Sequence, residues 1–379
     1  MPNDRFKTDC RHEIAVAQLE RELVSIGGRR LGQHEVELYR KRQFVAGWRL
    51  PFEFADQSCE VDLLVGADLP FVPARLALTE PPPFLTWPHV EEDGVLCVWP
   101  ESVAFPPRDV IGVTKSLLVE AADLLAKCAK NENRKDFLTE FNSYWSKALD
   151  NNPTSFLSLV DPCSPSRLIR VCRRKGFSLL GETETSLTNW IKNRYTIESI
   201  ECDQAAFIWL ERPLYPEEYP KTASDVFEIS RNFGVRGVEV LEQLTATEKK
   251  RAVVVFAAMT DNGPCLASVT ITAPQHRSAG GKLVDSLEKG FRPGHTPNLL
   301  LANRFWQAGT PAQRASVARV DAKWIHGRGV DERQPVLSKK KIVVIGCGSV
   351  GAPLAMQLAM SGVGEIWLID PGVLEPANT

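Results

Sequence analysis

The sequence predicts two domains of mixed helix and strand followed by a βαβ unit, and three observations point to this. Residues 1–150 begin with an amphipathic helix, continue with short alternating strands and end in helices. The run Asn151-Asn152-Pro153 is typical of a break between domains. A strand, a glycine-rich turn, a helix and a second strand follow one another at 341–370. We therefore expect an α+β domain over 1–150, a mixed α/β domain over 151–335 and a βαβ unit over 336–379.

The first domain opens with a predicted helix from Asp9 to Ser25. Its apolar residues recur at three- and four-residue steps, and Gly27-Gly28 provide the stop. Residues that alternate between apolar and polar then indicate strands. The further elements expected here are strands at 44–48, 59–65 and 75–78 and helices at 110–130 and 137–149.

The middle domain carries fewer signals. A strand is expected at 206–210, and two apolar strands at 252–258 and 266–272 flank Asp261-Asn262-Gly263, which is typical of a hairpin turn. A helix is expected at 299–308, after a loop-rich stretch. These elements predict a mixed α/β domain without a more specific topology.

The composition excludes several classes of function. Hydrophobic residues make up 44% and charged residues 24% of the chain, as in ordinary globular proteins. A net charge of −2 gives no basic patch for nucleic acid or for a membrane surface. We see no signal peptide and no apolar run long enough to cross a bilayer. The nine cysteines are scattered without metal-ligand spacing, so we expect free thiols in a reducing cytoplasm and no metal site.

Cys97 is the candidate nucleophile. It follows the turn residue Gly94, and the pair Val98-Trp99 after it indicates packed surroundings. His89 lies eight residues upstream, near enough in a folded loop to approach the sulfur. A thiol with a polar neighbour is typical of an acyl carrier. Taken alone, Cys97 could also be a small buried hydrophobic residue. A thiol protease site built on Cys97 and His89 is a further alternative, but the sequence shows no third residue to orient the histidine.

The second signal is a nucleotide-binding pattern near the end of the chain. Gly346, Gly348 and Gly351 directly follow a strand and open a helix, and Asp370 follows 19 positions after the last glycine. These glycines allow phosphates to approach the helix N-terminus, and the acid can accept a hydrogen bond from a ribose hydroxyl. An adenylating enzyme and an NAD-dependent oxidoreductase both fit this pattern.

The residues after the second strand resemble the ubiquitin-activating and ThiF-like family. Asp370, Glu375 and Asn378 match its pattern, while Gly372 stands where many members have a second Asp. The resemblance implies a Rossmann-like adenylation domain that uses ATP and Mg²⁺, with Asp370 at the ribose and Asn378 facing the phosphates. It covers about the last 40 residues, so we expect a chain truncated early in the activating domain.

The same resemblance implies a homodimer. In related activating enzymes an arginine ahead of the glycine loop reaches the phosphates of the partner subunit. Arg328 is the candidate for that role here, although a surface arginine is the plainer alternative.

The first domain resembles a ubiquitin-conjugating enzyme. Leu69-Pro70-Phe71-Val72-Pro73 is similar to that family's Tyr-Pro-Phe-x-Pro turn, Trp87-Pro88-His89 to its His-Pro-Asn, and Gly94-Val95-Leu96-Cys97 to its Gly-x-Ile-Cys. The departure is His89, which replaces the asparagine. The resemblance implies that Cys97 carries the acyl group and that His89 donates a hydrogen bond to the oxyanion formed during amine attack.

The order of the domains resembles the fused conjugating–activating proteins of bacterial type II CBASS anti-phage operons. The resemblance implies ATP-dependent activation of the C-terminal glycine of a cGAS-like nucleotidyltransferase. The acyl group would pass to an activating-domain cysteine, then to Cys97, and then to an amine on a target protein. A non-catalytic conjugating-type binding module is the alternative, against which the intact Cys97 argues.

Overall fold

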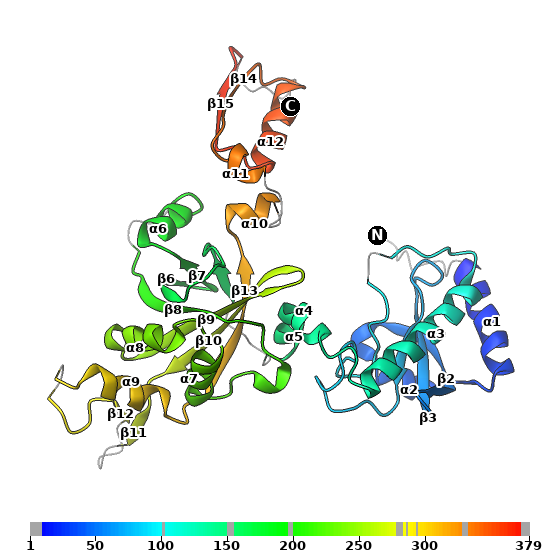
Figure 1. Ribbon diagram of the computed structural model, residues 1–379. Helices are drawn as coiled ribbons and strands as arrows, with labels where there is room; N and C mark the ends of the chain where they lie inside the picture. Colours follow the sequence, from blue (N-terminus) through cyan, green and yellow to red (C-terminus); the bar gives the residue numbers. More distant parts are fainter. Residues whose placement is uncertain are drawn as a thin grey trace. The chain divides into compact units, whose positions relative to one another are not determined.

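A computed structural model describes residues 10–100, 103–149, 155–195, 200–277, 283–285, 287–292, 295–327 and 333–372 (Figure 1). The chain divides between Phe137 and Leu138 into two compact units. Over the described ranges, no helix combines the length and the apolar character that crossing a membrane requires.

The N-terminal unit is an antiparallel sheet with two helices on one face. Its strands lie in the order β1-β2-β3-β4. Their bounds are β1 (Arg29–Arg30), β2 (Phe44–Phe54), β3 (Gln57–Gly66) and β4 (Arg75–Leu78), and the helices are α1 (Cys10–Ser25), α2 (Gln33–Glu37), the 3-10 turn η1 (Arg40–Arg42) and α3 (Val110–Ala129). The elements expected in this unit up to residue 130 are therefore present, although β2 continues to Phe54 where a strand ending at residue 48 was expected.

Strand β3 shows why the sheet has two different faces. Val61, Leu63 and Val65 point to one side and are buried in the core that α1 and α3 share with the sheet. The residues between them point to the other side because side chains alternate along a strand. There Leu64 packs in a second, smaller cluster that includes Tyr39.

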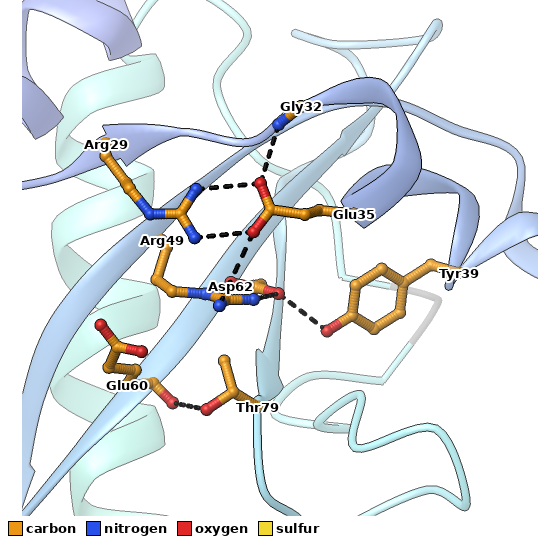
Figure 2. Close-up of polar contacts among 8 residues, drawn as sticks. All are labelled: Arg29, Gly32, Glu35, Tyr39, Arg49, Glu60, Asp62 and Thr79. Carbon is orange, nitrogen blue, oxygen red and sulfur yellow. Dashed lines mark hydrogen bonds and ion pairs between the residues drawn. The ribbon is translucent and has the colours of Figure 1, made fainter.

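A charged network lies on the face of the sheet opposite α1 and α3 (Figure 2). Asp62 is 1% exposed and accepts two hydrogen bonds from its cross-strand partner Arg49, at 2.8 and 3.0 Å. The hydroxyl of Tyr39 donates to the same carboxylate at 3.0 Å. Glu35 of α2 forms an ion pair with Arg49 and accepts two hydrogen bonds from Arg29. The network thus ties α2 and the 3-10 turn to the sheet.

The second unit contains a closed barrel of seven described strands, in the order β10-β13-β5-β7-β6-β8-β9 (Figure 1). Twelve buried apolar residues from these strands and their connections fill one core cluster, so the interior is packed. The barrel strands are β5 (Phe156–Ser158), β6 (Arg167–Arg174), β7 (Phe177–Gly181), β8 (Asp203–Trp209), β9 (Arg251–Thr260), β10 (Gly263–Thr272) and β13 (Ala312–Arg319). The hairpin expected at Asp261-Asn262-Gly263 is confirmed as β9–β10.

Helices cover part of the outside of this barrel. They pack against outward-facing residues such as Ile208, Phe256 and Val269 in a separate core cluster. The helices of this unit ahead of residue 320 are α5 (Phe141–Lys147), α6 (Glu184–Lys192), α7 (Ala223–Asn232), α8 (Gly237–Thr247) and α9 (Asn298–Trp306), with the 3-10 turn η2 (Pro216–Glu218) and the small hairpin β11 (Gln275–Arg277) and β12 (Leu283–Asp285).

The single helix expected at 137–149 is two helices, while the domain boundary expected at residue 150 stays a prediction. Helix α4 (Asp136–Thr139) crosses the break between the units, and α5 belongs to the barrel. The physical reason is aromatic packing, since Phe141 and Trp145 of α5 are buried in the outer core of the barrel. The indole N–H of Trp145 also donates to the carbonyl oxygen of Ala315 at 2.9 Å.

The end of the described chain is the expected βαβ unit. Strand β14 (Lys341–Ile345) and strand β15 (Glu365–Ile369) pair in parallel, with α12 (Gly351–Met360) between them in sequence. Two short helices, α10 (Ala322–Gly327) and α11 (Gln334–Leu337), precede β14.

Candidate functional site

The segment that ends at Cys97 is fixed to the edge of the sheet. The amide of Leu96 donates to the carbonyl of Leu76 in β4 at 2.7 Å, and the amide of Leu78 donates to the carbonyl of Gly94 at 2.9 Å. The side chain of Leu96 is buried in the main core of the unit. Cys97 therefore follows directly on an anchored residue.

The turn before this segment requires glycine at position 94. Gly94 has φ +80°, a conformation that side-chain-bearing residues rarely adopt. A Cβ atom here would lie 2.4 Å from the carbonyl oxygen of Leu78. The turn can approach β4 this closely because Gly94 has no side chain.

Cys97 and His89 lie opposite one another across this turn. Val90 and Leu96 form an antiparallel bridge, and the amide of Cys97 donates to the carbonyl of His89 at 2.8 Å. The backbones of the two residues are therefore adjacent at this point. His89 has φ +62°, which is uncommon for a residue with a side chain.

The imidazole of His89 is paired with a carboxylate. Its Nε2 lies 3.0 Å from Oδ2 of Asp136, the first residue of α4. The His89 side chain is 18% exposed and that of Asp136 is 41% exposed. The residue whose backbone pairs with that of Cys97 thus carries an imidazole held by a carboxylate of the same unit.

An apolar cavity of about 290 Å³ adjoins the residues that flank Cys97. Leu96, Val98 and Trp99 contribute to its wall, together with Phe71 and Val72 of the proline-rich turn. The Leu69–Pro70 peptide bond in that turn is cis. Two of the three sequence motifs expected in this domain, the proline-rich turn and the segment that ends at Cys97, therefore border one cavity.

The glycine loop lies where the two parallel strands of the βαβ unit end. The amide of Gly346 donates to the carbonyl of Ile369 at 2.8 Å. The amides of Cys347 and Gly372 donate to the carboxylate of Asp370 at 2.5 and 2.7 Å. These two backbone hydrogen bonds lower the pKa of Asp370. An ionised acid is thereby held beside the loop.

The glycines of this loop differ in what surrounds them. A Cβ on Gly351 would lie 1.7 Å from the carbonyl oxygen of Gly346, so this position is filled by the backbone. No described atom lies within 4 Å of the Cβ position of Gly348. The space at Gly348, at the entrance to the ten-residue helix α12, suits the close approach of a phosphate group.

Two regions of the chain match known families, and each contains one of these features. Residues 28–153 match the prokaryotic E2 family B, whose name denotes ubiquitin-conjugating-type proteins, and residues 325–379 match the ThiF family. A relative that aligns with 90% of this chain is named as a ubiquitin transferase-like protein. The chain is a fused E2–ThiF protein. Cys97 lies in its E2 part and the glycine loop in its ThiF part.

That relative is the ATP-dependent ubiquitin transferase-like protein Cap2 of Pseudomonas aeruginosa (strain BWHPSA011 / Pa011). It is 23% identical over 367 residues, which are 90% of this chain and 63% of Cap2. Adenylyltransferase and sulfurtransferase MOCS3 is 50% identical over 42 residues in Xenopus laevis and 45% in Mus musculus, in each case 11% of this chain and 9% of the relative. The fused E2–ThiF chain thus spans less than two thirds of the length of these relatives.

Three of the expected ThiF residues fall outside the described part of the chain. They are Arg328, Glu375 and Asn378, and their expected positions stay predictions. Among the described residues, no group of three or more His, Cys, Asp or Glu side chains is arranged to hold a metal ion.

Two residues near Cys97 were missed from the sequence. Asp136 lies 47 positions after His89, and nothing in the sequence marks the pair. Arg42 of the 3-10 turn donates to Asp93 at 2.9 and 3.1 Å. Burial lowers the pKa of Arg42. Asp93, Glu91 and Cys97 raise it by more, so the pKa of Arg42 lies above its usual value. A permanent positive charge therefore lies within electrostatic reach of the thiol.

Proposed function

We propose that this chain carries out ubiquitin-like conjugation, with Cys97 as the acyl carrier. The proposal rests on one observation above all: within the E2-family match, Cys97 follows an anchored turn and is joined by a backbone hydrogen bond to His89, whose imidazole contacts a carboxylate. A thiol at this place can hold an acyl group as a thioester and release it to a nucleophile.

The transfer consists of two exchanges at Cys97. In the first, the Cys97 thiolate attacks an incoming thioester; the new C–S bond forms and the old one breaks. In the second, an amine attacks the Cys97 thioester, a C–N bond forms, and the C–S bond breaks. The leaving thiolate takes up the proton that the amine loses. His89 serves the second exchange by donating a hydrogen bond to the oxyanion.

The ThiF part is proposed to prepare the acyl group. The space at Gly348 and the ionised Asp370 fit the phosphates and the ribose of ATP, with Mg²⁺ as counter-ion. Bound ATP supplies the activation of a C-terminal carboxylate. The name of the relative Cap2 states ATP dependence for that protein and supports this assignment.

The proposed setting is anti-phage defence of the type II CBASS kind. The C-terminal glycine of a cGAS-like nucleotidyltransferase is the proposed acyl group, an amine of a target protein is its acceptor, and the working protein is a cytoplasmic homodimer. The order of an E2 part before a ThiF part and the alignment with Cap2 support this setting.

The test uses a protein that joins this chain to a complete ThiF-family domain. It is incubated with ATP, Mg²⁺ and the nucleotidyltransferase, and the products are separated with and without reducing thiol. We expect a thiol-sensitive adduct that Cys97→Ala abolishes and Cys163→Ala keeps, since Cys163 is an exposed cysteine of the barrel unit. An adduct that survives Cys97→Ala would overturn the proposal, and tail binding without any adduct would favour the binding-module alternative.

A further inference from the structure

The contact between His89 and Asp136 restricts the chemistry of the imidazole. An ionised carboxylate only accepts hydrogen bonds, so the contact of 3.0 Å places a proton on Nε2 of His89. In the neutral ring the other nitrogen, Nδ1, then carries no proton. The ring can donate a second hydrogen bond only in its doubly protonated, positively charged form.

A second contact fixes the same segment to the neighbourhood of His89. The buried thiol of Cys128, at the end of α3, donates to the carbonyl of Pro88 at 3.5 Å. Asn133 donates to the Cys128 sulfur at 3.2 Å, and the amide of Asp136 donates to the carbonyl of Asn133 at 3.0 Å. Burial raises the pKa of Cys128, which keeps this thiol protonated. These hydrogen bonds therefore hold the segment that contains Asp136 beside Pro88, the residue before His89.

We propose that Asp136 is a positioning residue for the aminolysis step. It orients the His89 ring, and its negative charge stabilises the imidazolium form that donates to the oxyanion. Lys127, at the end of α3, is a positively charged group within electrostatic reach of Asp136. The inference rests on the proposed role of Cys97 and deepens it, since it assigns a charge state to the oxyanion donor.

The step balances without a further reactant. The amine nitrogen bonds to the thioester carbon, and the oxyanion that forms accepts a hydrogen bond from the His89 imidazolium. When the C–S bond breaks, the Cys97 thiolate leaves and is protonated by the proton that the amine releases. His89 and Asp136 end the step in the states in which they began it.

The test loads Cys97 without ATP. The chain is mixed with a glycine-ended peptide supplied as a small-molecule thioester, and intact-mass analysis with Cys97→Ala as reference reports the loaded fraction. Excess reagent is removed, an amine is added, and the decay of the Cys97 thioester gives the aminolysis rate. The variants are Asp136→Ala, Asp136→Asn and His89→Asn, with Asp123→Ala as the matched control. Asp123 is an exposed carboxylate of α3 in an ion pair with Lys127.

We expect every Asp136 variant to load like the wild type. Asp136→Ala should slow aminolysis roughly 10-fold or more, and Asp136→Asn, which keeps an acceptor but no charge, should fall in between. In the His89→Asn background, Asp136→Ala should change the rate by less than about twofold, because its partner is gone. Asp123→Ala should leave the rate unchanged.

Two results would overturn the inference. Equal slowing by Asp136→Ala with His89 and with Asn at position 89 would show that Asp136 does not act through the imidazole. Loss of loading together with aminolysis would show a purely structural role. Failure of the wild type to form any thioester on Cys97 would instead remove the proposed function, and the inference with it.

Discussion

The amide of Cys97 donates to the carbonyl oxygen of His89 over 2.8 Å, so the proposed nucleophile and its imidazole partner are joined through the backbone. Because this bond involves no side-chain atom, a change of either side chain leaves it in place. The contributions of the two side chains can therefore be separated by substitution. The first prediction uses this separation.

Replacing the imidazole should affect only the release of the acyl group. We expect His89→Ala to leave loading of Cys97 intact and to slow aminolysis about 100-fold, the usual effect of losing one oxyanion donor. Single-turnover measurement of loading and of thioester decay distinguishes the two steps. If both steps decline equally, His89 has a structural role.

Two glycines of the nucleotide loop should behave differently when each is changed to alanine. Gly351→Ala places a Cβ 1.7 Å from the carbonyl oxygen of Gly346 and should disturb the loop itself. Gly348→Ala meets no described atom within 4 Å, so the fold should persist while ATP binding weakens. Thermal unfolding and titration with ATP, in a protein with a complete ThiF-family domain, measure both effects. Unchanged ATP binding in Gly348→Ala would argue against a phosphate at this position.

The buried carboxylate of Asp62 should stabilise the N-terminal unit strongly. Asp62→Ala leaves Arg49 and the hydroxyl of Tyr39 without their shared acceptor (Figure 2). Breaking a buried ion pair on one side costs about 3–5 kcal/mol of unfolding free energy. Urea denaturation measures this, and Asp123→Ala, at an exposed ion pair, should cost less than about 1 kcal/mol. Similar losses of unfolding free energy in the two variants would contradict the strong stabilising role assigned to Asp62.

Glu35 should make the stability depend on pH in acid. The hydrogen bonds from Arg29 and from the amide of Gly32 lower the pKa of Glu35 from 4.5 to about 2. A lowered pKa in the folded state stabilises the protein above pH 4.5, and this contribution disappears as the pH falls from 4.5 through 2. The melting temperature of Glu35→Gln should therefore fall less steeply than that of the wild type across this range. Parallel curves would contradict the prediction.

Local patterns allowed much of the fold to be predicted. Strand β4 has the bounds expected from its apolar residues, and β14 begins at the expected residue 341, because alternation and short apolar runs are properties of neighbouring residues. The barrel could not be predicted in this way. Its closure depends on pairings between distant segments, such as the parallel pairing of Phe156 with Val317. No local pattern encodes such a pairing.

In the candidate site, too, the residues in short motifs could be predicted and the residue brought in by a distant contact could not. Cys97, His89 and the glycines of the nucleotide loop lie in short motifs and could be selected from the sequence, although their catalytic and binding roles stay predictions. Asp136 could not be selected, because it approaches His89 only through the turn that follows α3. The hydrogen bond that holds the imidazole, which sequence alone leaves open, is made to that distant residue.

The allocation of α5 to the barrel has a practical meaning for exchanging E2 domains among related proteins. A graft cut at the end of the E2-family match, at residue 153, would carry Phe141 and Trp145 away with the donor. The recipient barrel would then expose the apolar surface that these two rings cover, and the transplanted domain would bear two large unpacked aromatic side chains. A graft joined between residues 137 and 138 leaves each hydrophobic core with its own residues.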